Sequence, residues 1–96
     1  MKTTITVPVE VVEKLQNLSI EVESRGSIIQ KMIQDGVNIE SASFIGYQAE
    51  YQKFYVEYER EKHLFQQNYV DAQFGEKALS WNLDFATCQA EITLKD

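Results

Sequence analysis

The sequence is poor in residues that interrupt regular structure and in residues that form cross-links. Its 96 residues contain one proline, four glycines, one histidine and one cysteine. So few helix and strand breakers permit long regular elements. The single cysteine, Cys88, excludes an internal disulfide and is compatible with a reducing compartment, and we therefore expect a cytoplasmic protein.

Motifs that carry reactive chemistry are also missing. His63 and Cys88 each occur alone, without the CxxC or HExxH spacing that holds a metal ion. The four glycines stand apart from one another, so no glycine-rich loop is available to cradle a phosphate. The carboxylates Glu57, Glu59 and Glu61 have the pattern of a solvated helix face with local ion pairs. We therefore expect no catalytic residue, no metal and no cofactor, and a protein that is not an enzyme.

Positive charge is scarce. Nine Lys and Arg residues stand against fifteen Asp and Glu, and the net charge of -6 repels phosphate backbones and anionic membrane surfaces. No apolar run approaches the roughly 20 residues of a membrane span, and the N-terminal residues have no apolar signal core. The charge therefore disfavours nucleic acid as a partner, and no membrane association is expected.

The most regular stretch lies between Val9 and Gly36. Apolar residues recur there at three- and four-residue intervals, which predicts a helical seam in a helix that ends near Gln34. Arg25 takes one place in the seam that an apolar residue should hold. Gly36, which follows Asp35, can take the left-handed conformation that ends a helix. The seam comprises Val11, Leu15, Leu18, Val22, Ile29 and Met32, and Val12, Ile28 and Ile33 widen it.

Two further features flank or interrupt this helix. Residues 2–7 alternate and are mostly β-branched, which predicts a short strand that Pro8 ends. Residues 24–27 (SRGS) leave two alternatives open, because a glycine costs about 1 kcal/mol of helix propensity and either serine can cap a new helix. The heptad phase continues across this segment, and we expect one continuous helix.

A turn at residues 24–27 would instead give the order strand, helix, helix, in which residues 2–35 resemble the ribbon-helix-helix family of DNA-binding dimers. The resemblance rests on the alternating strand, on Pro8, on SRGS as a small-residue turn and on the apolar pair Ile28-Ile29. It implies a dimeric repressor or antitoxin whose paired strands enter the major groove. The residues that would face DNA are Lys2, Thr4 and Thr6, of which only one is basic.

A second helix is expected at about residues 42–70, where aromatic rings recur at helical spacing and Ser41 or Ser43 is the expected N-cap. A connection of about six residues favours antiparallel packing of the two helices as a hairpin. Residues 71–77 are expected to form a loop. The rings belong to Phe44, Tyr47, Tyr51, Phe54, Tyr55, Tyr58, Phe65 and Tyr69.

The C-terminal residues have the period of a strand. The parity of the apolar residues changes near residues 86–87, where no Gly, Pro or Asn stands, and we expect a bulged, bent strand rather than a hairpin. The first parity is held by Leu79, Trp81, Leu83 and Phe85, and the second by Cys88, Ala90, Ile92 and Leu94. The fold class is therefore predicted as α+β, with two long helices and a short antiparallel sheet of N- and C-terminal strands, in a single domain of residues 1–96.

Five tyrosines, five phenylalanines and a tryptophan are more rings than a small core can cover, because a domain of this size buries only about 60–65% of its unfolded surface. We therefore expect a non-enzymatic interaction or assembly module that forms a homo-oligomer, binds another protein, or both. The expected contact residues are Trp81, Leu83, Phe85, Tyr51, Tyr55 and Tyr58. The alternative functions are a ribbon-helix-helix repressor or antitoxin and an acidic inhibitor that occupies the nucleic-acid channel of another protein.

Overall fold

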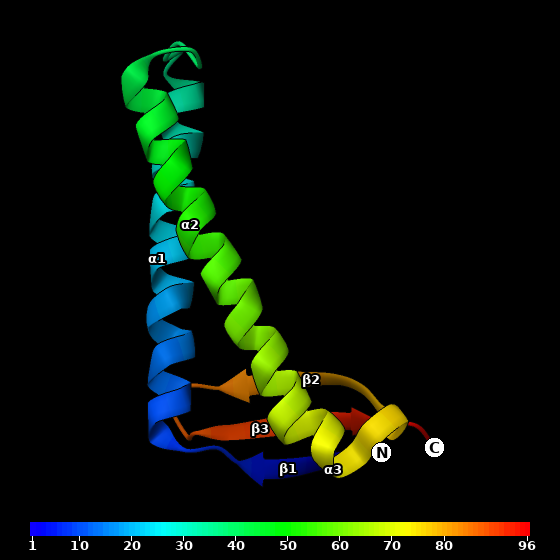
Figure 1. Ribbon diagram of the computed structural model, residues 1–96. Helices are drawn as coiled ribbons and strands as arrows, with labels where there is room; N and C mark the ends of the chain where they lie inside the picture. The colour runs from blue at the N-terminus through cyan, green and yellow to red at the C-terminus, as the bar shows by residue number, and fades with distance from the viewer. The chain divides into compact units, whose positions relative to one another are not determined.

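The computed structural model describes all residues from 1 to 96 as two long helices and a three-stranded antiparallel sheet (Figure 1), which confirms the expected α+β class. The strands are β1 (Lys2–Thr6), β2 (Ala78–Asp84) and β3 (Gln89–Leu94), and the long helices are α1 (Val9–Gln34) and α2 (Ala42–Phe65). Between α2 and β2 lie a π-helix, η1 (Gln66–Asp71), a short helix, α3 (Ala72–Phe74), and a 3-10 turn, η2 (Gly75–Lys77).

The chain divides into two compact units. The first unit comprises residues 1–16 and 61–96 and therefore holds the sheet, and the second comprises residues 17–60. Both long helices run through the unit boundaries without interruption, so each helix contributes to both units. That the chain forms a single domain stays a prediction.

The sheet of the first unit has the strand order β1–β3–β2, and both strand pairs are antiparallel. β3 is central, and its Ala90 and Ile92 are completely buried. Ile92 stands opposite Thr3 of β1 and Trp81 of β2. The two chain ends meet at this sheet, where the amino terminus lies 3.0 Å from the Asp96 carboxylate (Figure 1). The expected pairing of N-terminal and C-terminal strands is thus confirmed.

β2 and β3 form a hairpin, so the expectation of one bent strand is wrong. The turn spans residues 85–88 and contains no glycine. The Ala86 N–H donates to Asp84 Oδ1 at 2.9 Å, and Cys88 has a left-handed conformation with φ of 57°. A bulge does occur, but at Leu79, where β2 shifts its register against β3. Asp84 therefore supplies the turn signal that Gly, Pro or Asn gives in other hairpins.

α1 is one helix through residues 24–27, as its heptad phase predicts. A Cβ atom on Gly26 would lie 3.3 Å from Cε2 of Tyr51, so the glycine admits a ring of α2 close to the α1 backbone. The helix ends where it was expected to end. Gly36 has φ of 79°, and the Val37 N–H donates to the Met32 carbonyl at 2.9 Å, which is the hydrogen bond of a Schellman cap.

α2 begins where it was expected and ends earlier. Ser41 is its N-cap, because Ser41 Oγ accepts a hydrogen bond from the Phe44 N–H at 3.3 Å. The α-helix ends at Phe65, and the chain continues through η1, α3 and η2, so the expected loop at residues 71–77 is wrong. Val70 of η1 is only 1% exposed, and its burial stabilises helical structure in a polar stretch with little helical pattern of its own.

The hydrophobic core is unevenly divided between the two units. The second unit buries only Leu18 and Phe44. The first unit buries seven hydrophobic side chains, which come from β3, the link between β1 and α1, the first turns of α1, the end of α2 and η1. These seven are Val7, Val12, Leu15, Phe65, Val70, Ala90 and Ile92. Most of the tightly packed apolar surface therefore lies around the sheet.

Candidate functional site

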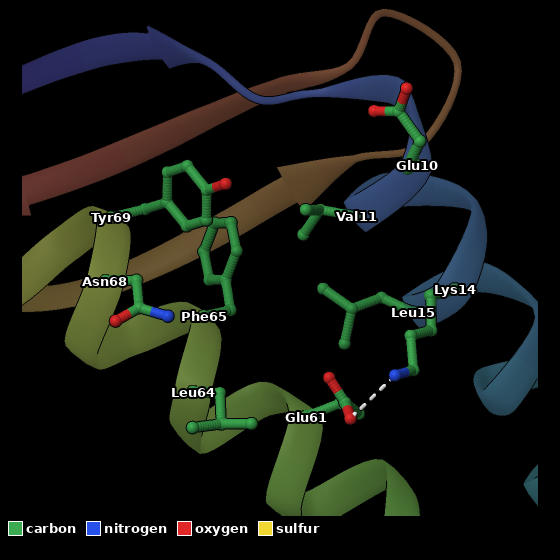
Figure 2. Close-up of a pocket in the computed structure, with 9 residues that line it drawn as sticks. All are labelled: Glu10, Val11, Lys14, Leu15, Glu61, Leu64, Phe65, Asn68 and Tyr69. Carbon is green, nitrogen blue, oxygen red and sulfur yellow. Dashed lines mark ion pairs between the residues drawn. The ribbon is translucent and has the colours of Figure 1, made fainter.

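A groove of about 310 Å³ lies in the first unit, between the first turns of α1 and the end of α2 with η1 (Figure 2). Val11 and Leu15 of α1 point toward Phe65 and Tyr69 on the opposite wall. Both pairs of residues are four apart in sequence, a spacing that places side chains on one face of a helix. The two walls are therefore formed by the inward faces of two helical segments.

The floor of the groove is apolar and well supported. Leu15 and Phe65 are 3% and 2% exposed, and the Phe65 ring stacks on that of Tyr69 with 5.3 Å between centroids. The Phe65 ring also contacts Trp81 of β2, with 4.7 Å between ring centroids. Leu64 stands at the rim and is 41% exposed. The groove can therefore receive an apolar side chain without a rearrangement of its floor.

The rim of the groove carries charge. Lys14 Nζ lies 2.9 Å from Glu61 Oε1, and this ion pair closes one end of the opening (Figure 2). Glu10 stands at the opposite end, is exposed and takes part in no ion pair of the structure. Two carboxylates and one ammonium group thus line the groove, which leaves one negative charge at the Glu10 end.

η1 brings two polar groups to the same opening. Asn68 and Tyr69 belong to this π-helix and line the groove with an amide and a phenol hydroxyl (Figure 2). π-helical turns are rare and are found frequently at functional sites. In this chain the π-helix η1 forms part of the groove wall.

The polar groups of the groove are two carboxylates, one ammonium group, one amide and one phenol. The groove contains no cysteine, histidine, serine or threonine side chain. His63 is exposed on α2, and Cys88 lies in the turn between β2 and β3. Nowhere in the chain do three or more His, Cys, Asp or Glu side chains gather as a metal site would require.

The predicted contact residues of β2 and its following turn do not line the groove. Trp81 is half-buried against Phe65 and supports the groove floor. Leu83 is half-buried opposite Ala90, and Phe85 is the half-buried first residue of the hairpin turn. The structure therefore places these three side chains along β2 and the turn that follows it, within the first unit.

The predicted contact residues of α2 lie in the second unit. Tyr51 is half-buried over Gly26, and its ring centroid is 5.9 Å from that of Tyr55, which is 42% exposed. Tyr58 is half-buried one turn further along α2. These tyrosines form a partly exposed row on α2, and none of them lines the groove.

The three residues assigned to DNA under the ribbon-helix-helix resemblance share one face of β1. Lys2, Thr4 and Thr6 are all exposed there, as the alternating pattern predicts. Lys2 Nζ lies 3.3 Å from Glu91 Oε1, so its charge already has a partner. Glu91 also lines a shallow recess of about 200 Å³ on this face, together with Thr4 and Asp84. The outward face of the sheet is therefore not cationic.

None of the six predicted contact residues lines the groove, and its residues were not predicted as a site. The sequence does carry a signal for its α2 wall, because Glu61, Leu64, Phe65 and Asn68 follow helical spacing. The α1 wall is part of the predicted seam. What the sequence does not reveal is that these two stripes leave an opening between them.

Comparison of the chain with protein-family models, with curated proteins and with solved structures finds no match. No helix in the structure combines the length and the apolar character that crossing a lipid bilayer requires.

Proposed function

We propose that the chain is a non-enzymatic interaction or assembly module that joins another protein chain, either a second copy of itself or a partner protein. The observation that carries the proposal is the apolar surface of the second unit. Residues 17–60 bury two large side chains, Leu18 and Phe44, and leave eight that are 42–64% exposed. The eight are Ile20, Ile28, Ile33, Ile39, Ile45, Tyr47, Tyr55 and Val56.

This distribution supports association because covering a large apolar side chain completely is favourable by about 1.5–3 kcal/mol. Single apolar residues on a protein surface are ordinary. This unit differs because it has eight exposed large apolar side chains and only two buried ones. The unit itself consists of two helical segments and their connection, and no further element of that unit covers their outer faces. Another chain would supply the missing contacts.

Sedimentation velocity of the full chain, from low to high micromolar concentration, tests the proposal together with recovery of bound proteins by pull-down. Ile28→Glu and Val56→Glu are expected to weaken association by about tenfold or more, because each places a charge in a contact that excludes water. The matched controls are Ser27→Glu and Gln52→Glu, which add the same charge at exposed polar positions of the same helices. A strictly monomeric chain that recovers no partner would contradict the proposal.

The two alternative functions receive less support. In a ribbon-helix-helix dimer the chain would turn at residues 24–27, where α1 is continuous, and Lys2 would contact phosphate rather than Glu91. A repressor would be recognised by salt-sensitive binding to duplex DNA that Lys2→Glu abolishes.

An acidic inhibitor is consistent with the net charge of -6 and would compete with the nucleic-acid substrate of its target.

A further inference from the structure

We propose that the groove between α1 and the α2–η1 segment binds a helical segment of a partner protein that presents a large apolar side chain next to a lysine or arginine. The inference rests on the proposed function, since it names the chemistry of one partner for the interaction module. Its basis is the combination of an apolar floor with an unpaired negative charge at the Glu10 end of the rim.

The volume of the groove selects side chains rather than a large ligand. At about 310 Å³ it stands at the low end of small-molecule sites, which measure about 300–1,000 Å³. Its floor residues Leu15 and Phe65 are almost fully buried, whereas Leu64 at the rim remains 41% exposed. An apolar side chain that enters the groove would cover Leu64 and the exposed part of Tyr69.

The shape of the groove suits a helix. Its longer wall runs from Glu61 to Tyr69, a distance of roughly 12 Å along a helix, or about two turns. Amphipathic helices dock in such grooves through apolar residues that are three or four apart, so two anchors of one partner helix span this wall. Strand pairing is not available here, because both walls are helical and their backbone groups are already engaged.

Charge selects the flanking residues of that helix. Lys14 is committed to Glu61, whose side chain is only 16% exposed, so this pair is satisfied within the chain. Glu10 has no such partner, and the Asn68 amide and Tyr69 hydroxyl are further polar groups at the opening. A lysine or arginine on the partner can reach the Glu10 carboxylate, whereas an acidic segment or a second copy of this chain, at -6, meets repulsion.

The test uses two synthetic amphipathic peptides and the full chain. The first has a leucine stripe at helical spacing flanked by lysine and arginine, and its twin carries glutamate in place of every lysine and arginine. Binding is followed by the fluorescence of Trp81, which contacts the groove floor through Phe65, and by backbone amide shifts. We expect the cationic peptide to bind at least about tenfold more tightly than its twin, with shifts concentrated in residues 10–15 and 61–69.

Variants assign the binding to the groove. Leu64→Ser is expected to weaken binding of the cationic peptide by about tenfold and Glu10→Gln by several-fold, because one loses an apolar contact and the other an ion pair. The controls are Leu79→Ser and Glu13→Gln, which make the same changes at exposed positions of the first unit outside the groove. Both controls should bind like the unmodified chain.

Several results would overturn the inference. These are no binding of either peptide, equal binding of both, or binding that Leu64→Ser leaves unchanged. If sedimentation still detects self-association or a partner protein in that case, the proposed function survives and only the groove assignment fails. If Leu64→Ser abolishes self-association, the groove holds a second copy and the cationic partner is ruled out. A monomeric chain that binds neither peptide nor protein would contradict both proposals.

Discussion

Arg25 occupies a position in the apolar seam of α1, and its planar, charged guanidinium makes the contacts there. Its guanidinium lies 4.4 Å from the centroid of the Phe54 ring and pairs with Glu21 at 3.0 Å and Glu50 at 2.7 Å. Stacking on a ring and pairing with carboxylates both suit the geometry of arginine. Its Nε is buried without a hydrogen-bond partner, so the arrangement also carries a cost. Arg25 therefore joins α1 and α2 through its contacts with Glu50 and Phe54.

The neighbouring Gly26 and the distant Gly46 form a matched pair for a test of the Tyr51 contact. Nothing lies within 4 Å of a Cβ built on Gly46, so Gly46→Ala should raise the free energy of unfolding by about 0.5–1 kcal/mol through helix propensity. On Gly26 the new Cβ would stand 3.3 Å from the Tyr51 ring, and the gain should fall below about 0.5 kcal/mol. Urea unfolding followed by circular dichroism measures both. Equal gains would mean that the Tyr51 ring moves aside at no cost.

The turn between β2 and β3 contains a residue with an unusual backbone conformation. Cys88 is the one non-glycine residue with positive φ in the chain, at 57°. In this conformation an L-residue destabilises the folded state by about 1–2 kcal/mol relative to glycine. Glycine has an opposing effect, because its greater freedom in the unfolded chain lowers the free energy of unfolding by about 0.5–1 kcal/mol. Cys88→Gly should therefore raise the free energy of unfolding by up to about 1.5 kcal/mol.

The control for that element is Ala86→Gly in the same turn. Ala86 has no positive φ, so glycine there brings only added freedom to the unfolded chain and should lower the free energy of unfolding by about 0.5–1 kcal/mol. Thermal unfolding of both variants gives the comparison. A destabilised Cys88→Gly variant would indicate that the half-buried thiol contributes more by packing than its backbone conformation costs.

At the scale of the whole molecule, the continuity of α1 and α2 across the boundaries of the two compact units predicts one cooperative unfolding transition. Trp81 reports on the first unit, and circular dichroism reports on helices that belong to both. In urea the two signals should have the same midpoint, because neither helix contains a break at which one unit could unfold alone. A Trp81 transition at a different urea concentration would contradict this and the single-domain prediction.

The parts of the fold that the sequence predicted correctly depend on residues close together in the chain. The extent of α1, the glycine cap at Gly36, the serine cap at Ser41 and the alternation of β1 all follow from spacing within a few turns or strands. Ile28 and Ile33, which were expected to widen the seam of α1, are exposed instead. The continuity of α1 at Gly26 was also predicted, because the heptad phase on both sides of the segment agrees. Local periodicity carried that information.

The errors arise where distant residues determine the outcome. Residues 71–77 were expected to form a loop, yet they continue in helical turns that follow η1, whose Val70 is buried in the first unit. The β2–β3 hairpin was expected to be one bent strand, because a turn made by Asp84 and a left-handed Cys88 has no common sequence signal. The candidate groove was not predicted at all, since its walls come from residues about fifty positions apart.

The sequence by itself determined that this chain forms two long helices and a short sheet, with many rings and few reactive groups. Helical and strand periods, caps and composition are encoded by near neighbours, and a single chain displays them directly. Only the tertiary structure decided which apolar residues remain exposed, where the chain turns back as a hairpin, and that Glu10 stands unpaired at the edge of an apolar groove. Those outcomes depend on which side chains meet across long sequence separations, and no local pattern specifies that.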